Sequence, residues 1–308
     1  MSLPQPPDRG RPQLHRPPGA APGLPRRAYG RTGEQLSIIG VGGMLVANLE
    51  PGHARRLVAE AIERGVNYFD VAPSYWNAEE VLGPALEPYR NRVFLACKTL
   101  ERTQEGARAE LERSLERLRT DHFDLYQLHA LSDVATDVDV AFGRGGALET
   151  LIEAKRSGRV RYLGFSAHSE AAALAALDRY AFDSVLFPVN FAAYTVGHFG
   201  SRIMAKAEAQ GVARLALKAM ARQAWPADDP RRPQFPKCWY EPITDPREAE
   251  LALRFTLSQP VTAALPPGEE MLFRRALDIA AAFRPLTPVE QTEVNLLAQA
   301  LTPVFSAS

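Results

Sequence analysis

The clearest periodic pattern of apolar side chains lies in residues 51–65. They recur every three or four positions, at Ala54, Leu57, Val58, Ala61 and Ile62. This spacing puts them on one face of a helix. Gly65 suits the left-handed conformation that ends many helices, and Val66–Asp70 then has the composition of a strand. The segment predicts a helix followed by a strand.

The same succession of helix, glycine and strand returns twice. An apolar helix pattern beginning at Leu148 leads to Gly158 and the run Val160–Phe165, and a helix before Gly211 leads to Ala213–Leu217. Two later helices have strong start signals, because 245–248 reads Asp-Pro-Arg-Glu and 287–290 reads Thr-Pro-Val-Glu. A cap residue, proline at the first helical position and glutamate at the third are typical of helix N-termini.

Eight segments qualify as strands, and each leads into a helical pattern. They are Ile38–Val41, Tyr68–Asp70, Val93–Cys97, Phe123–Gln127, Val160–Phe165, Ser184–Phe187, Ala213–Leu217 and Thr262–Leu265. Eight β-α units over about 250 residues favour a closed (β/α)₈ barrel of the TIM-barrel type. An open doubly wound sheet is the rival, but residues 40–43 (Gly-Val-Gly-Gly) lack the G-x-G-x-x-G spacing of its phosphate turn.

Two additions to the barrel are predicted. Arg27–Tyr29 and Gln35–Ser37 flank a Gly-Arg-Thr-Gly turn, and we expect them to form a β-hairpin that plugs the barrel floor. The helix that starts at Thr287 is an extra C-terminal helix. Residues 1–27 hold eight prolines and no apolar periodicity, so we expect a disordered tail there and a single barrel domain over 28–308.

Composition and charge exclude several classes of protein. The 36 basic residues balance the 36 acidic ones, which argues against nucleic-acid binding through phosphate neutralisation. No apolar run has the ~18 residues of a membrane span, and none follows Arg26-Arg27, so we expect no export signal and a cytoplasmic location. The two cysteines and six histidines lack ligand spacing, so no metal site is predicted.

Four polar residues follow three adjacent predicted strands. Asp70 closes the second strand, Tyr75 lies five residues further on, Lys98 ends the third strand and His129 ends the fourth. In such barrels the catalytic groups lie at the carboxyl ends of the strands. A single residue of this kind is more often structural, but an acid, a phenol, an ammonium and an imidazole in this order indicate one catalytic cluster.

The chemistry of the cluster suits carbonyl reduction. A phenol has a pKa near 10, so Tyr75 can act as a general acid. We expect the Lys98 cation to lower that pKa, and Asp70 to pair with Lys98. His129 can donate a hydrogen bond to an oxygen on which negative charge develops.

With these residues, the sequence resembles the aldo-keto reductase family over about residues 28–285. The matching blocks are Gly65–Tyr75 (GVNYFDVAPSY), Ala78–Gly83 (AEEVLG), Cys97–Thr99 (CKT), Asp124–His129 (DLYQLH) and Arg161–Ser166 (RYLGFS). The resemblance implies the barrel fold, a nicotinamide dinucleotide cofactor, NADP(H) or NAD(H), and the four residues as a catalytic tetrad.

The blocks that would bind the cofactor match that family less well. We assign Gly43, Ser166, His168, Asn190, Lys218 and Arg274 to the cofactor. The family's asparagine after Ser166 is Ala167 here, with His168 as its replacement, and Leu217-Lys218 stands where an aromatic often stacks on the nicotinamide. Glu269 and Glu270 would repel a 2′-phosphate, while Arg274 would partly restore the attraction.

Two tryptophans and a long loop are predicted near the substrate. Trp76 and Trp239 lie in loops on the catalytic face, where we expect them to line the pocket. The proline-rich segment 222–246 is interpreted as a flap over cofactor or substrate.

The leading hypothesis is an oxidoreductase that reduces small aldehydes or ketones with hydride from NAD(P)H. Two alternatives stay open: a barrel aldolase in which Lys98 forms a Schiff base, and a cofactor-binding protein that keeps the fold without turnover. The sequence does not give the oligomeric state.

Overall fold

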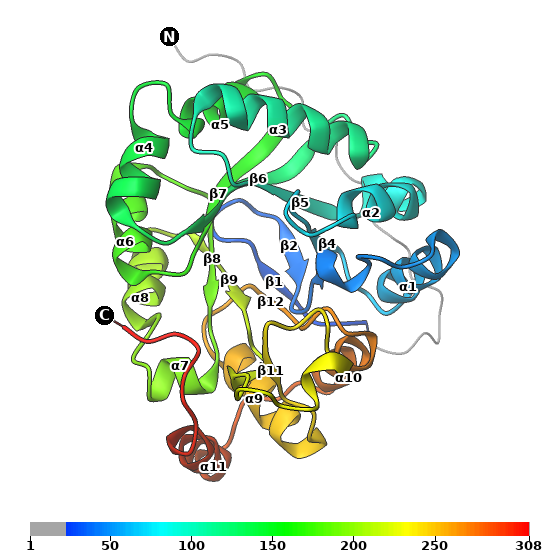
Figure 1. Cartoon of the computed structure of the whole chain (residues 1–308), viewed down its shortest axis with the longest axis vertical. Coiled ribbons are helices and arrows are strands. Elements are labelled where there is room, and N and C mark those ends of the chain that lie inside the picture. The colour runs from blue at the N-terminus through cyan, green and yellow to red at the C-terminus, as the bar shows by residue number, and fades with distance from the viewer. Residues whose placement is uncertain (1–22, 308) are drawn as a thin grey trace.

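Eight short apolar segments form the parallel strands of a barrel in the computed structural model, which describes residues 23–307 (Figure 1). The strands are β3 (Val41–Gly42), β4 (Tyr68–Asp70), β5 (Phe94–Thr99), β6 (Phe123–Leu131), β7 (Val160–Ala167), β8 (Ser184–Pro188), β9 (Ala213–Leu217) and β12 (Ala263–Leu265). They pair in chain order from β3 to β12. The amide of Ala264 donates to the carbonyl of Ile38 (2.9 Å) and that of Gly40 donates to Ala264 (3.0 Å), so the first and last strands close the barrel.

Helices surround the barrel and connect its strands (Figure 1). The longer ones are α1 (Pro51–Glu63), α2 (Ala78–Leu86), α3 (Gln104–Arg117), α5 (Ala147–Arg156), α6 (Glu170–Arg179), α8 (Ser201–Ala209), α9 (Pro246–Ser258) and α10 (Glu270–Ala281). Shorter turns are η1 (Gly43–Leu45), η2 (Glu87–Arg92), η3 (Val134–Val138), α4 (Asp139–Phe142), α7 (Phe191–Thr195) and η4 (Arg232–Gln234). The expected (β/α)₈ barrel is confirmed.

The predicted helix ends follow from local chemistry. Gly65, Gly158 and Gly211 have φ of 99°, 78° and 67°, the left-handed region that glycine enters without a steric penalty. At the start of α9, the Asp245 carboxylate accepts hydrogen bonds from the amides of Arg247 (2.9 Å) and Glu248 (2.8 Å). The strand and helix signals were therefore accurate to within a few residues.

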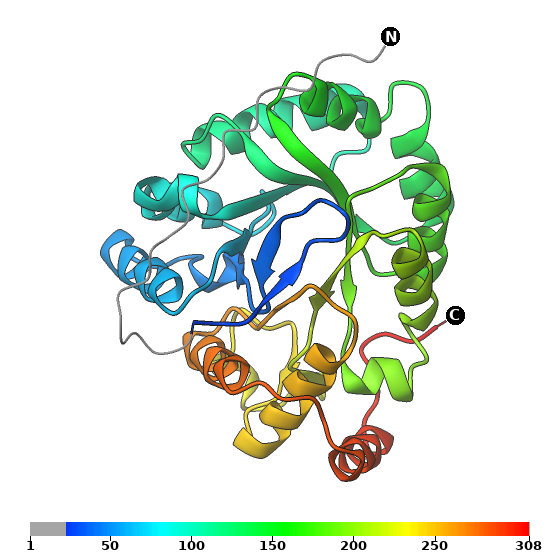
Figure 2. The same ribbon diagram turned by 180° about the vertical axis from the view of Figure 1, so that it is seen from behind.

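The N-terminal hairpin covers one end of the barrel (Figure 2). Strand β1 (Arg26–Ala28) pairs with β2 (Gln35–Ser37), so the hairpin includes Arg26 and Arg27 of the predicted tail. Tyr29 is fully buried and its ring contacts Phe94 (5.0 Å between centroids). The predicted plug is confirmed, whereas residues 1–22 of the expected tail lie outside the described residues.

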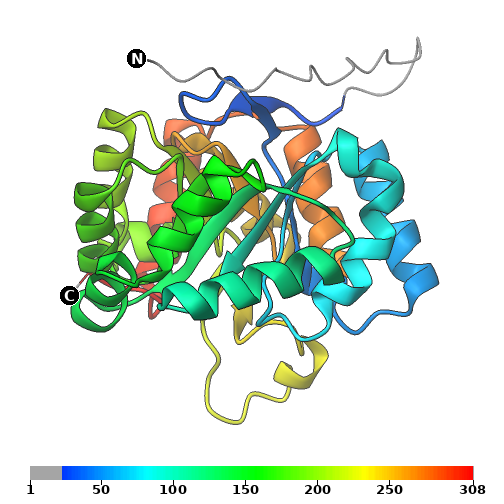
Figure 3. The same ribbon diagram turned by 90° about the horizontal axis from the view of Figure 1, so that it is seen from above.

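A second hairpin lies at the opposite end of the barrel (Figure 3). Strands β10 (Ala221–Ala224) and β11 (Tyr240–Pro242) pair at the base of the proline-rich segment that we interpreted as a flap. The sequence analysis did not predict the two strands, because the segment contains six prolines, which are rare within strands. The amide of Lys237 donates to Glu269 (3.0 Å) and its ammonium to the carbonyl of Leu45 (2.9 Å), so these bonds tie the hairpin to the barrel rim.

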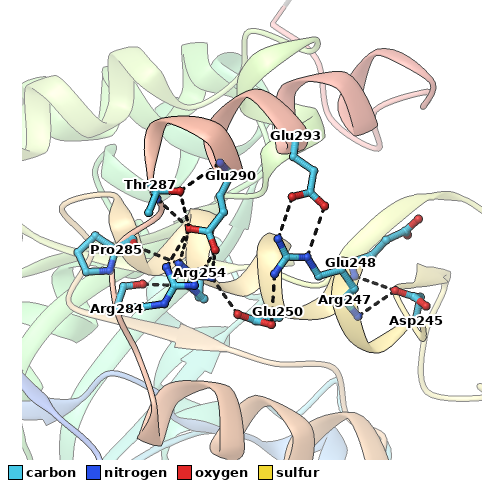
Figure 4. Close-up of polar contacts among 10 residues, drawn as sticks. All are labelled: Asp245, Arg247, Glu248, Glu250, Arg254, Arg284, Pro285, Thr287, Glu290 and Glu293. Atoms are coloured by element: carbon cyan, nitrogen blue, oxygen red, sulfur yellow. Dashed lines mark hydrogen bonds and ion pairs between the residues drawn. The ribbon is translucent and has the colours of Figure 1, made fainter.

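The extra C-terminal helix α11 (Pro288–Gln299) is docked by an ionic cluster in which Arg254 and Glu290 are buried and Arg284 is exposed (Figure 4). Glu290 accepts two hydrogen bonds from Arg254 (2.7 and 2.8 Å) and two from Arg284 (2.9 and 2.8 Å). A capping box between Thr287 and Glu290 starts the helix. The chain then returns to the barrel, where the amide of Ala307 donates to Gly197 (2.7 Å).

Candidate active site

The four residues of the predicted tetrad lie at one end of three neighbouring strands. Asp70 ends β4, Lys98 is in β5, His129 is in β6, and Tyr75 follows β4 in the connection to α2. The parallel register aligns Asp70 with Ala96 and Lys98 with Gln127. Strand pairing therefore brings together residues that are up to 59 positions apart in the sequence.

A buried ion pair forms the centre of this cluster. The Lys98 ammonium contacts one carboxylate oxygen of Asp70, and both side chains are only 1% exposed. The other oxygen of Asp70 accepts from the Tyr68 hydroxyl (2.9 Å) and the Gln127 amide (3.0 Å). These bonds offset the cost of burying two charges.

Tyr68 and Gln127 were missed in the sequence analysis, although each has a signal. Tyr68 stands two positions before Asp70, on the same face of a strand. Gln127 is a polar residue in an otherwise apolar strand and lies beside Lys98 in the register. Both position the carboxylate.

Lys98 also faces the Tyr75 phenol. Its Nζ lies 3.5 Å from the Tyr75 hydroxyl and 5.1 Å from the centre of the ring. Burial opposes the charged form of Lys98, but the Asp70 carboxylate outweighs it and raises the pKa of Lys98. The ammonium therefore stays charged beside the phenol.

We expected Lys98 to lower the pKa of Tyr75 below its ordinary value, and this prediction was wrong, because the pKa is raised overall. Burial raises the pKa of Tyr75, and the Lys98 cation opposes this rise only in part. The sequence shows the cation but not the depth of the phenol in the barrel. Tyr75 is consequently a protonated phenol at neutral pH.

His129 packs against Tyr75 as a neutral imidazole. The two rings meet edge to face, with centroids 5.7 Å apart and an interplanar angle of 82°. Burial, followed by the charge of Lys98, holds the pKa of His129 well below 6.5. Its Nδ1 is buried and has no hydrogen-bond partner among residues 23–307.

Two side chains hold the backbone around His129. The Arg102 guanidinium donates to the carbonyl of His129 (2.6 Å). Ser166 Oγ accepts from the amide of Ala130 (2.8 Å), a residue with φ of +56°. Trp76 (φ +49°) and Lys218 (φ +64°) are also in this region of backbone space, which non-glycine residues rarely adopt. Strained backbone thus recurs around the tetrad.

Several residues assigned to the cofactor have packing contacts or hydrogen bonds within the protein itself. Gly43 begins η1, where a Cβ atom would lie 2.7 Å from Val71 Cγ2. Asn190 Oδ1 accepts from the amide of Ala193 (2.8 Å) and so caps α7. Together with Ser166, which anchors Ala130, these residues shape the rim of the barrel, and their contact with a cofactor stays a prediction.

His168, Lys218 and Trp239 meet around the C-terminal segment. The Phe305 ring lies 5.3 Å from the His168 ring and 6.1 Å from Trp239, measured between centroids. Lys218 Nζ lies 5.2 Å from the centre of the Trp239 ring. Burial, followed by the charge of Lys218, lowers the pKa of His168 to about 4, so this imidazole is also neutral. Trp239 and Trp76 are 54% and 53% exposed.

Arg274 is held by acidic side chains. It binds both oxygens of Glu60 (closest distances 2.9 Å) and Glu270 (3.2 Å), and Glu270 also contacts His53 (2.8 Å). These residues do not fit a 2′-phosphate, because the cation is already neutralised. The N-terminus of α10 has no side-chain cap, so its backbone N–H groups suit a pyrophosphate or another anion.

Two structural absences concern the described part of the chain. Between residues 23 and 307, no group of three or more His, Cys, Asp or Glu side chains is arranged to hold a metal ion. Over the same residues, no helix is long and apolar enough to cross a membrane.

Solved structures show the same architecture. The holo form of aldo-keto reductase AKR11C1 from Bacillus halodurans superposes with a TM-score of 0.69 at 23% identity, covering 90% of this chain and 97% of that protein. This likeness shows the fold.

Curated relatives match parts of the chain. Uncharacterized oxidoreductase YqkF of Bacillus subtilis (strain 168) is 32% identical over 155 residues, 46% of this chain and 48% of that protein. Methylglyoxal reductase YeaE of Escherichia coli (strain K12) is 38% identical over 109 residues, 34% of this chain and 36% of that protein. The matched segments thus span about half or less of these relatives.

A model of the Aldo/keto reductase family matches residues 38–235, more than half of the 308 residues. That range includes the four residues of the buried cluster. The resemblance noted from the strand-end motifs is confirmed, and the chain belongs to the aldo/keto reductase family.

Proposed function

We propose that this protein is an oxidoreductase that reduces an aldehyde or ketone with a nicotinamide dinucleotide, and that Tyr75 is the general acid. The observation that carries the proposal is the Tyr75 hydroxyl lying 3.5 Å from the ammonium of Lys98, beside an imidazole with an unpartnered buried nitrogen. A nicotinamide dinucleotide, when bound, would supply hydride for the carbonyl carbon.

The proton moves from the Tyr75 hydroxyl to the carbonyl oxygen. The raised pKa of Tyr75 keeps the proton on the phenol until negative charge develops on the substrate oxygen. Lys98 then stabilises the phenolate that forms, because its own charge is maintained by Asp70. The Asp70–Lys98 pair acts on Tyr75 and does not exchange the proton itself.

His129 would orient the carbonyl. A neutral imidazole has one N–H donor, and the lowered pKa of His129 keeps the ring neutral over the working pH range. A donor aimed at the developing oxyanion lowers the barrier more than it strengthens ground-state binding. Its backbone is fixed by Arg102 and Ser166, so the ring needs little reorganisation.

The aldolase hypothesis is disfavoured by the state of Lys98. A Schiff base requires a neutral amine, whereas Asp70 raises the pKa of Lys98 and binds its ammonium directly. The hypothesis of a binding protein without turnover has one observation in its favour, the neutralised Arg274. The unpartnered imidazole nitrogen beside the Asp70–Lys98 pair favours turnover.

The cofactor is proposed to be NADH or NADPH, with the charges at α10 favouring NADH. Arg274 is already paired with Glu60 and Glu270, and Arg275 of the same helix donates to the carbonyl of Thr244. A 2′-phosphate would have to compete with these partners, and it would meet the negative charge of the two glutamates. The substrate is proposed to be a small carbonyl compound, and the protein to act in the cytoplasm.

The test is turnover of 4-nitrobenzaldehyde with NADH and NADPH by wild type and Tyr75→Phe. We expect the variant to lose about 100-fold or more in kcat, since positioned acids typically contribute this much. Cofactor affinity, measured by tryptophan fluorescence, should change little.

Tyr89→Phe is the matched control, because Tyr89 is a partly buried tyrosine in η2 rather than at the carboxyl ends of the strands. Equal turnover by wild type and Tyr75→Phe would remove Tyr75 from the mechanism. Cofactor binding without turnover of any carbonyl compound would favour the binding-protein hypothesis.

A further inference from the structure

Lys218 is a cation with aromatic neighbours and no acidic partner. Its Nζ lies 4.9 Å from the centre of the Tyr240 ring and 5.2 Å from that of Trp239. Among residues 23–307, Nζ has no hydrogen-bond or ion-pair partner. Aromatic faces replace only part of the hydration that an ammonium loses on burial. The ammonium is therefore available to an anion.

The backbone at Lys218 is in an unfavourable conformation. Lys218 directly follows the last residue of β9, and its φ is +64°. Residues other than glycine rarely adopt this left-handed backbone conformation. Glycine or asparagine would adopt this conformation at less cost. Strain of this kind persists where the direction of a side chain matters.

Lys218 lies at the carboxyl ends of the barrel strands, the end that carries the tetrad, because it directly follows β9. Burial lowers the pKa of Lys218 to about 8, and the Lys98 cation adds to this decrease, while Cys238 opposes it. The charge of Lys218 in turn lowers the pKa of His168 and of His129.

The charges in this region do not balance. Asp70 neutralises Lys98, and both imidazoles are neutral, so Lys218 leaves an excess of one positive charge beside the tetrad. The acidic groups Glu60, Glu269 and Glu270 are instead gathered around α10 and Lys237. An anionic group on the substrate would restore the balance.

We propose that Lys218 is a specificity-determining residue that binds the carboxylate of the substrate, so that the preferred substrates are oxo acids. The inference rests on the proposed carbonyl reduction. It replaces the assignment of Lys218 to the cofactor, because its contacts are to Trp239 and Tyr240, and Trp239 is a residue predicted to line the substrate pocket. The aromatic rings on which Nζ rests hold it in place for this contact.

The kinetic test compares each acid with a neutral analogue: succinic semialdehyde with butanal, and pyruvate with methyl pyruvate. We expect wild type to prefer the acid in at least one pair. This preference is measured as the ratio of kcat/KM for the acid to kcat/KM for its neutral analogue. Lys218→Met should reduce the ratio about 10- to 100-fold, the usual range for losing a charged hydrogen bond. Lys218→Arg should retain most of the ratio. Lys206→Met, which removes an exposed lysine paired with Asp178, is the control.

A binding test does not depend on turnover. Oxamate carries a carboxylate but is not reduced, and it should change the emission of Trp239, which lies against Lys218. We expect Lys218→Met to abolish saturable oxamate binding and Trp239→Phe to remove most of the signal. Oxamide, which is neutral, should not change the tryptophan emission of wild type or of Lys218→Met.

The outcomes separate this proposal from the proposed function. Absence of any acid preference in wild type, or a preference that survives in Lys218→Met, would overturn the role of Lys218 while leaving carbonyl reduction intact. A loss of cofactor affinity in Lys218→Met with an unchanged ratio would return the residue to the cofactor. If no carbonyl compound is turned over, the reductase hypothesis fails, and oxamate binding still decides whether Lys218 recognises a carboxylate.

Discussion

Two ionic clusters in this protein, each built on a buried ion pair, differ in how completely their polar atoms are bonded. In the cluster of Arg254, Arg284 and Glu290, the guanidiniums bind the carboxylate in matched pairs, and Arg254 also donates to the carbonyls of Arg284 and Pro285 (both 3.0 Å; Figure 4). In the cluster of Asp70 and Lys98, the carboxylate accepts from Lys98, Tyr68 and Gln127, but polar groups next to the ion pair lack partners.

The difference lies in the groups next to the ion pair. Tyr75 has one long contact from Lys98 (3.5 Å), and His129 Nδ1 has no partner in the described part of the chain. A saturated cluster stabilises the position of a helix, whereas a cluster with open donors retains hydrogen-bonding capacity for a ligand. The comparison predicts that mutations in the first affect stability and mutations in the second affect turnover.

The largest expected effect is on turnover, from Lys98→Met. Without the cation, the phenolate of Tyr75 loses its stabilising charge, and kcat should fall by about 100-fold or more. The single variant also leaves Asp70 buried and unpaired, which should lower the melting temperature strongly. The combined variant Asp70→Asn/Lys98→Met should recover much of the melting temperature but not the turnover. Recovery of turnover in the double variant would contradict the role given to Lys98.

The next effect is on stability, from Glu290→Ala. This variant leaves Arg254 buried without its main acceptor, so the melting temperature should fall by roughly 5 °C or more. The kcat at 25 °C should be unchanged because α11 packs mainly on α7 and α9, on the outside of the barrel (Figure 1). Glu293→Ala, which removes one exposed partner of Arg247, is the matched control and should change the melting temperature little.

The stability difference should depend on pH. Hydrogen bonds from Arg254, followed by those from Arg284, hold the pKa of Glu290 well below its usual 4.5. A lowered carboxyl pKa stabilises the fold above the unfolded-state pKa, and this contribution decreases as the pH falls below it. The gap in melting temperature between wild type and Glu290→Ala should therefore be widest near pH 7 and narrow on acidification below about 4.5. A gap that widens on acidification would be inconsistent with this cluster.

The smallest effect concerns cofactor choice. In the variant Glu60→Gln/Glu270→Gln, Arg274 loses both of its acidic partners. The affinity for NADPH relative to NADH should rise about 3- to 10-fold, the scale of two exposed ion pairs. Fluorescence titration with both dinucleotides measures the ratio, and an unchanged ratio would show that Arg274 does not face the 2′-phosphate.

The sequence was most informative where the signal is local. Helix caps such as Asp245 and Thr287, the glycine at 65 and the strand-end order of Asp70, Lys98 and His129 each depend on a few neighbouring residues. From these features we could predict the barrel and the residues of the candidate cluster.

Properties that depend on distant residues could not be predicted in this way. The pairing of Arg274 with Glu60 joins residues 214 positions apart, and the net pKa shift of Tyr75 depends on burial by the whole barrel rim. Ala130 and Lys218 adopt a left-handed backbone conformation, which the sequence does not indicate because neither residue is a glycine. The hairpin β10–β11 was hidden by the prolines around it.

The most direct test of the central claim follows a deuterium label from a nicotinamide cofactor deuterated at C4 on either face to 4-nitrobenzaldehyde. Mass spectrometry of the alcohol formed by wild type should show one deuterium on the former carbonyl carbon with one of the two labelled cofactors. Tyr75→Phe should form this product at least about 100-fold more slowly. An unlabelled product with both cofactors, or labelled product formed at the same rate by Tyr75→Phe, would contradict the account.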